Sequence, residues 1–237
     1  MNSRQRVNAI GMAAALLLLG FGANPNADAG VFGLGGDSWK EEVLLHDGQK
    51  IIVERSQSYG GFSEPGQGAP VKEHRLVFTP PGSKKSITWT SGYGEELGRT
   101  NFNLLAVHVL DGTPYLVVEP NLCLSYGKWG RPNPPYVFFK YEGSEWKRID
   151  LDAFPAAFKT VNVVINESRQ RDIKRLQNEA GYVPAEGVRE INNSLRDPEY
   201  QSILRAELPP SALCPDWSSP KYRSPKAPLP IGSSPDK

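Results

Sequence analysis

Short apolar runs separated by turn sequences fill the chain between residues 39 and 149. The runs expected to form strands are 39–45, 51–55, 75–79, 86–91, 102–110, 115–119, 136–141 and 145–149. Within 86–91, Ile87 and Trp89 alternate with two threonines, which is the period of a strand with one buried face. The central runs 102–110 and 115–119 are apolar at nearly every position, which indicates strands covered on both faces. Because successive hairpins with tight turns are typical of antiparallel sheets, the pattern predicts a mainly β fold, either a hairpin meander or a sandwich.

The period of the pattern changes after residue 150. Residues 151–158 favour a short helical turn, and residues 161–165 favour one more strand. Ile173, Leu176 and Ala180 then recur at helical spacing, with Gly181 as a C-terminal stop. Pro184 opens a second stretch with a narrow apolar stripe. We therefore expect one or two short C-terminal helices on the surface or edge of the sheet.

The N-terminus has the three-part layout of a secretory signal peptide. Arg4 and Arg6 precede a short apolar run at 12–21, and Ala27-Asp28-Ala29 supplies the small residues of a cleavage site. A membrane span needs roughly 20 apolar residues, so this shorter run predicts cleavage after Ala29 and no membrane span in the mature chain. A periplasmic location follows as the expectation, with an extracellular one as the alternative.

These features divide the chain into four expected parts. They are a signal peptide over 1–29, a flexible Gly-rich segment over 30–37, a single β-rich domain with a helical C-terminal part over 38–208, and a Pro/Ser-rich tail over 209–237 that is disordered at its end.

The charge is nearly balanced, with 27 basic and 26 acidic residues. Removing Arg4, Arg6 and Asp28 with the signal peptide leaves 25 of each (27 − 2 and 26 − 1). Binding to phosphate backbones needs a basic excess or stripe, so nucleic acid is not expected as a partner.

Two cysteines, Cys123 and Cys214, are present. In an oxidising compartment such a pair usually forms a disulfide, which would hold the C-terminal segment on the β domain. Two unpaired buried thiols are the alternative. Two cysteines do not complete a four-ligand set, so no metal site is expected.

The stretch 121–136 carries the most distinctive candidate binding residues. It reads as a long loop between strands and contains Tyr126, Lys128, Trp129, Arg131 and Tyr136 among glycines and prolines. Aromatic and arginine side chains on a rigid loop suit a binding hot spot. The structural alternative is that Tyr126 and Trp129 cap the end of the sheet, since large aromatic side chains are usually packed.

No catalytic motif, metal motif or cofactor motif emerges. His108, inside an apolar strand, is expected to be a hydrogen-bonded core residue. Residues 92–98 resemble a phosphate loop, but their spacing does not fit the dinucleotide fingerprint and no βαβ unit surrounds them. Catalytic residues therefore stay unknown, and no cofactor is expected.

Several segments resemble those of a group of uncharacterised exported proteins of Gram-negative bacteria. The segments are 101–105, 112–115 and 121–141, and the run Lys128-Trp129-Gly130-Arg131-Pro132-Asn133-Pro134-Pro135 is the most specific of them. The resemblance extends from Trp39 to about Leu208 and implies a periplasmic or surface location. It brings no assigned activity and no catalytic residue.

The leading functional hypothesis is a non-enzymatic periplasmic protein whose rigid β domain binds a protein partner in the cell envelope. One version is an immunity-type protein that blocks a toxin from a competing cell. The first rival is an envelope hydrolase built from dispersed carboxylates such as Glu95, Glu119 and Asp111. The second rival is a carbohydrate-binding module that uses Tyr126 and Trp129.

Overall fold

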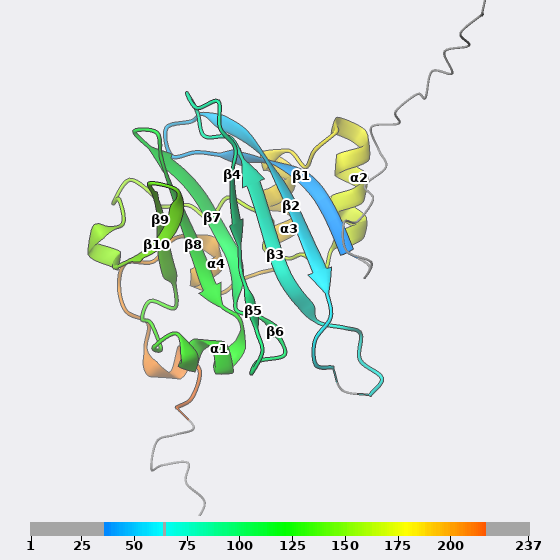
Figure 1. Ribbon diagram of the computed structural model, residues 1–237, viewed down its shortest axis with the longest axis vertical. Helices are drawn as coiled ribbons and strands as arrows, with labels where there is room; N and C mark the ends of the chain where they lie inside the picture. The colour runs from blue at the N-terminus through cyan, green and yellow to red at the C-terminus, as the bar shows by residue number, and fades with distance from the viewer. Residues whose placement is uncertain (1–35, 64, 217–237) are drawn as a thin grey trace, which may run out of the picture.

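Two four-stranded antiparallel sheets carry the fold, and each is a meander of neighbouring strands (Figure 1). The computed structural model describes residues 36–63 and 65–216. The expected signal peptide over 1–29, residues 30–35 of the Gly-rich segment and residues 217–237 of the tail lie outside the described residues. The fold is mainly β, as the alternating apolar pattern predicts.

The first sheet has the strand order β1-β2-β3-β4. Its strands are β1 (Gly36–Leu44), β2 (Lys50–Tyr59), β3 (Val71–Phe78) and β4 (Ile87–Thr90). β1 begins inside the segment expected to be flexible, because Asp37 pairs with Gln57 and accepts a hydrogen bond from the Tyr59 hydroxyl. Every second side chain of these strands points inward, as the burial of Val43, Val53 and others shows.

The second sheet has the order β10-β9-β8-β7. Its strands are β7 (Phe102–Leu110), β8 (Thr113–Pro120), β9 (Val137–Glu142) and β10 (Glu145–Ile149), and the short pair β5 (Tyr93–Gly94) and β6 (Arg99–Thr100) precedes them. One face of this sheet shares a core with the first sheet, where Val53 and Leu76 pack with Leu104 and Leu116. The other face is covered by a second apolar cluster that includes Phe154 and Phe158. The near-continuous apolar character of β7 and β8 follows from this burial on both faces.

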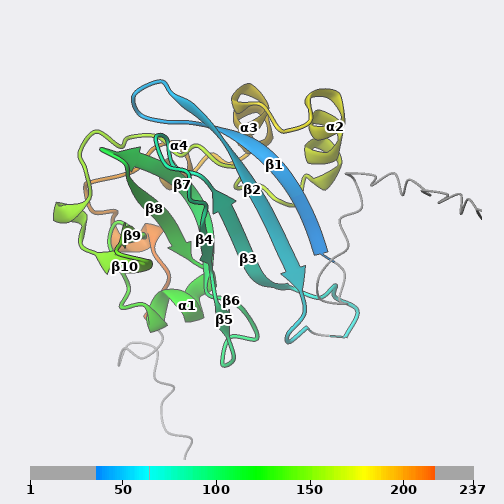
Figure 2. The same cartoon turned by 45° about the horizontal axis from the view of Figure 1, so that its top comes forward.

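The helices are short and lie at the margins of the sheets. They are α1 (Leu122–Lys128), α2 (Gln170–Ala180), α3 (Ala185–Asn192) and α4 (Pro198–Gln201), with single turns of 3-10 helix at η1 (Leu151–Ala153) and η2 (Pro210–Ala212). Figure 2 shows α2 and α3 beside β1, on the side of the molecule away from β9 and β10. Gly181 ends α2 with φ +81°, the left-handed conformation that glycine adopts without strain. Among the described residues, no helix is long and apolar enough to cross a bilayer.

The strand predicted over 161–165 is wrong. This segment forms no ladder with a neighbouring strand. Side chains supply its hydrogen bonds instead: Glu41 accepts from the Val164 amide, and the Asn192 side chain accepts from the Ile165 amide. Val163 and Val164 are buried, which explains the strand-like apolar pattern.

Candidate functional site

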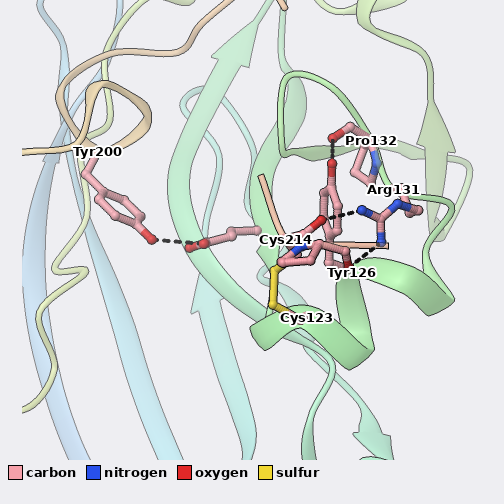
Figure 3. The surroundings of a disulfide bond; sticks show 8 residues. Cys123, Tyr126, Arg131, Pro132, Tyr200 and Cys214 are labelled. Atoms are coloured by element: carbon pink, nitrogen blue, oxygen red, sulfur yellow. Dashed lines mark hydrogen bonds between the residues drawn. A yellow bond between two sulfur atoms is a disulfide. The ribbon is translucent and has the colours of Figure 1, made fainter. Parts of the chain in front are cut away.

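The stretch 121–136 is fastened to the rest of the protein and is not a free loop. Its first half forms α1, which the sequence did not predict because Leu122 and Leu124 are exposed and give no amphipathic pattern. Cys123 on α1 forms a disulfide with Cys214, so the predicted bridge is present (Figure 3). The bridge ties the C-terminal segment to the end of the second sheet, as expected.

Three of the five predicted binding residues contact the protein's own chain. Tyr126 is buried, and its hydroxyl donates to the Pro132 carbonyl at 3.0 Å. The Arg131 guanidinium lies 5.1 Å from the centre of the Tyr126 ring and donates to the carbonyl oxygens of Cys214 and Pro215 (Figure 3). The buried Tyr136 places its hydroxyl 3.0 Å from the Glu199 carbonyl oxygen. Arg131 and Tyr136 thus hold the C-terminal segment in place, and the Tyr126 ring lies beneath the Arg131 guanidinium.

Lys128 is also engaged within the chain. Its Nζ lies 2.5 Å from a carboxylate oxygen of Glu96 and 3.2 Å from the side-chain oxygen of Asn101. Glu96 sits in the turn between β5 and β6, so this ion pair links that turn to α1.

Trp129, the fifth predicted residue, lines a surface hollow. The hollow has a volume of about 500 Å³ and is bounded by Thr88, Trp89, Thr90, Ser91, Gly92, Asn101, Phe102, Trp129, Phe139 and Trp146. Trp129 packs on Phe102 with 4.5 Å between the ring centres. Ligand pockets have volumes of about 300–1,000 Å³, so this hollow can take a side chain or a small group of a ligand.

None of the residues that line the hollow carries a titratable side chain. Two cations adjoin the lining. The Lys128 ammonium lies 3.2 Å from the side-chain oxygen of Asn101, and the Arg148 guanidinium lies 5.9 Å from the centre of the Trp129 ring and donates to the Trp129 carbonyl. Within the described chain, the buried indole N–H of Trp129 has no acceptor. Such an orphan donor is rare in native proteins, and its burial closes it to solvent. The aromatic lining of the hollow therefore suits a largely apolar group.

Most of the hollow's walls come from residues that the sequence did not single out. Trp89 belongs to β4, whereas Phe139 and Trp146 belong to β9 and β10. The alternation of β4 correctly places Trp89 on the inner face, but no local pattern shows that β4 and β10 meet. Their contact depends on how the two sheets pack.

The three carboxylates named for the rival hydrolase, Glu95, Asp111 and Glu119, do not come together at one site. Glu95 and Asp111 are exposed in two different turns. Glu119 is mostly buried at the end of β8, where it accepts a 2.9 Å hydrogen bond from the Tyr200 hydroxyl. Burial raises the pKa of Glu119 to about 7. None of the three lines the aromatic hollow.

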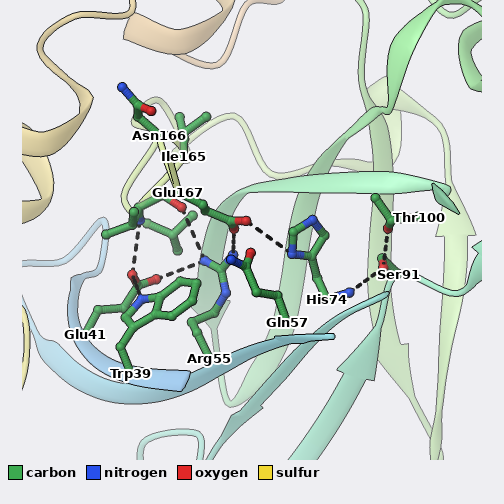
Figure 4. A network of polar contacts seen from close by, with 12 residues as sticks. Trp39, Glu41, Arg55, Gln57, His74, Ser91, Thr100, Ile165, Asn166 and Glu167 are labelled. Carbon is green, nitrogen blue, oxygen red and sulfur yellow. Dashed lines mark hydrogen bonds and ion pairs between the residues drawn. The ribbon is translucent and has the colours of Figure 1, made fainter. Parts of the chain in front are cut away.

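A buried polar cluster lies under the first sheet (Figure 4). Arg55 is almost fully buried, and its guanidinium contacts the carboxylates of Glu41, at 3.1 Å, and Glu167. The second carboxylate oxygen of Glu167 is 3.3 Å from Nδ1 of His74. Glu41 also accepts from the indole N–H of Trp39 and from the Val164 amide. The cluster fastens segment 163–167 to the sheet.

Charge balance explains the titration of this cluster. Burial raises the pKa of Glu167 to about 7, against the lowering effect of Arg55, and the nearby Glu41 raises it further. Burial and the Arg55 charge lower the pKa of His74 to about 3. One guanidinium faces two carboxylates, so the arrangement favours a proton on Glu167 and a neutral His74. The sequence did not indicate this cluster, because its members come from β1, β2, β3 and residue 167.

His108 is a hydrogen-bonded core residue, as predicted. It is fully buried, and its Nε2 lies 3.0 Å from the Thr160 carbonyl oxygen, to which it donates. Its ring stacks on Phe158 with 4.5 Å between the centres.

Across 36–63 and 65–216, no group of three or more histidine, cysteine or acidic side chains is arranged to hold a metal ion. Comparison with protein-family models, with curated proteins and with solved structures finds no match to this chain.

Proposed function

We propose that this protein is an exported, non-enzymatic binding module that holds a protein partner at the aromatic hollow. The observation that carries the proposal is the lining of the hollow, which combines three tryptophans and two phenylalanines with neutral polar groups. Tryptophan is enriched among the residues that contribute most to binding at protein interfaces. A lining without a titratable side chain offers no general acid or base, which favours binding over hydrolysis.

Export to the periplasm is part of the proposal. It is supported by the layout of the first 29 residues and by the Cys123–Cys214 disulfide, since disulfides persist in oxidising compartments.

The carbohydrate-binding hypothesis needs two stacking rings, and one of them is buried. It requires Tyr126 and Trp129 as exposed platforms, but Tyr126 is buried beneath Arg131. The test below therefore treats a sugar ligand as an alternative outcome.

The test is capture of a partner from periplasmic extract by the mature protein and by matched variants. The hollow variant is Trp129→Ala with Trp146→Ala, and the control is Glu145→Ala with Lys147→Ala, two exposed residues of β10 outside the lining. A partner that the wild type and the control retain, and that the hollow variant binds at least about tenfold more weakly, would support the proposal. A partner held equally by all three proteins would place the binding surface elsewhere. Elution of the partner by soluble glycans would favour the carbohydrate-binding version.

A further inference from the structure

Two outer strand edges in the described part of the chain are covered by the chain itself. Along β1, the Val183 carbonyl accepts from the Glu42 amide, and the Val183 amide donates to the Lys40 carbonyl, both at 2.8 Å. Along β7, the Asn162 side chain accepts from the Val107 amide and donates to the Val107 carbonyl. These backbone groups of Lys40, Glu42 and Val107 are therefore not free for another strand.

The outer edge of β10 is protected differently. Glu145, Lys147 and Arg148 occupy three of its five positions and are exposed. Charged side chains on an edge strand oppose pairing with another strand.

β4 has neither kind of protection. Its sequence Ile87-Thr88-Trp89-Thr90 carries no charge, and β-branched and aromatic residues favour strands. The Ser91 amide donates to the His74 carbonyl on β3, so by the alternation of an antiparallel ladder the backbone groups of Thr88 and Thr90 face away from β3. In the described chain, one of these four outward groups has a partner: the Thr88 carbonyl accepts from the indole N–H of Trp146 at 2.8 Å.

The open edge and the aromatic hollow adjoin. Thr88, Trp89 and Thr90 all line the hollow, and the rings of β9 and β10 lie across it. A strand added beside β4 would place the side chain opposite Trp89 on the inner face, toward the hollow, and the side chains opposite the two threonines toward solvent.

We propose that the β4 edge binds an extended peptide segment of the partner protein as an added strand, with one apolar or aromatic side chain in the hollow. The inference rests on the proposed function and specifies how the same site binds. The segment has the pattern polar-apolar-polar opposite Thr88, Trp89 and Thr90. Its backbone pairs with Thr88 and Thr90, and main-chain hydrogen bonds of this kind give affinity while the pocket gives specificity.

The probe for the test is a phage-displayed library of random dodecapeptides, selected on the mature protein. Selected peptides are then synthesised with a fluorescent label, and their Kd values are measured by fluorescence polarisation. The decisive variant is Thr90→Pro, which removes an outward N–H without removing a hydrogen bond to β3, because proline is tolerated at such edge positions. The matched comparison is Thr90→Val, which also changes the side chain but keeps the N–H. Thermal unfolding checks that both variants are folded.

The expected result is a consensus of alternating polar and apolar residues, with Kd at least tenfold higher for Thr90→Pro than for Thr90→Val. Methylation of the peptide's backbone nitrogens should weaken binding at every second position only, since alternate amides face β4. A binding peptide insensitive to Thr90→Pro would overturn strand addition. Failure to select any peptide would also overturn it.

These results separate the two proposals. If the envelope partner is lost from the hollow variant but binds Thr90→Pro normally, the hollow binds a partner without strand addition. If sedimentation shows that the chain dimerises and that Thr90→Pro abolishes the dimer, the occupant of the edge is a second copy of this chain, and the proposal of a partner's segment is wrong.

Discussion

The indole N–H of Trp146 on β10 donates a 2.8 Å hydrogen bond to the carbonyl oxygen of Thr88 on β4. It occupies an acceptor on the open edge of the first sheet that the backbone N–H of an added strand would otherwise use. Trp146 also packs edge-on against Tyr141, with 5.1 Å between ring centres. The Trp146 side chain therefore forms part of the wall of the hollow. It also competes with an added strand for the Thr88 carbonyl oxygen.

Replacing Trp146 with phenylalanine should separate these two roles. Trp146→Phe keeps an aromatic ring against Tyr141 but removes the N–H, which leaves the Thr88 carbonyl free. A net hydrogen bond contributes roughly 1 kcal/mol, so we expect the Kd of a selected peptide to fall by up to about fivefold. Fluorescence polarisation measures the change, and Trp146→Ala, which also loses the ring, should weaken binding. An unchanged Kd for Trp146→Phe would show that the indole N–H and the peptide do not compete.

Removing the disulfide should loosen the C-terminal segment before it affects the sheets. The bridge joins residues 91 positions apart, and the chain-entropy model gives such a loop roughly 4–5 kcal/mol of unfolding free energy as an upper figure. Cys123→Ser with Cys214→Ser should lower the free energy of unfolding by that amount or less, measured by urea denaturation. Hydrogen exchange should rise at 199–216 while β7 and β8 stay protected. Uniform loss of protection across the sheets would contradict this order.

Apart from the two-residue strands β5 and β6, the strands were predictable because each depends on a local pattern. The alternation of Ile87 and Trp89 and the continuous apolar run of β7 correspond directly to burial on one face and on two faces. The stop at Gly181 was predictable for the same reason, since it depends on the backbone of one residue.

The errors arose where tertiary contacts replaced local ones. Val163 and Val164 have the pattern of a strand, but the side chains of Glu41 and Asn192 take the hydrogen bonds that a strand would make. The aromatic hollow was predictable only in part. The sequence indicates Trp129 as a candidate binding residue, but Trp89 and Trp146 come together only through the packing of two sheets. Tyr126 and Arg131 are as distinctive in the sequence as Trp129. Only their contacts show that Arg131 holds the chain's own C-terminal segment and that Tyr126 packs beneath it.

Arg55 should be among the most sensitive positions for stability. Arg55→Met removes the positive charge between Glu41 and Glu167 and leaves the buried Glu41 carboxylate without its cation. Breaking one partner of a buried ion pair costs about 3–5 kcal/mol, and we expect a loss of that size in urea denaturation. Adding Glu41→Gln and Glu167→Gln should recover part of the loss, because the unpaired charges disappear. No recovery would indicate that packing of the Arg55 side chain, and not its charge, is what the cluster requires.

Glu119 should make stability fall as the pH rises from acidic values to about 7. Its folded-state pKa is raised to about 7, above the unfolded value near 4.3, so between these pH values the folded state holds a proton that the unfolded state has lost. The carboxyl therefore destabilises the fold progressively from about pH 4.3 to 7, by at most about 3–4 kcal/mol over this shift of roughly 2.7 units.

Glu119→Gln removes this titration and keeps a side-chain oxygen as an acceptor for Tyr200. We expect its free energy of unfolding relative to wild type to increase with pH across that window and to level off above about pH 7. The difference between the two proteins isolates Glu119 from Glu167, whose pKa is also about 7, and from His74 and His108, whose lowered pKa values give the opposite slope. Urea denaturation at pH 4, 5, 6, 7 and 8 measures it. A difference that does not change with pH would mean that the Glu119 carboxyl is already ionised in the folded protein at acidic pH.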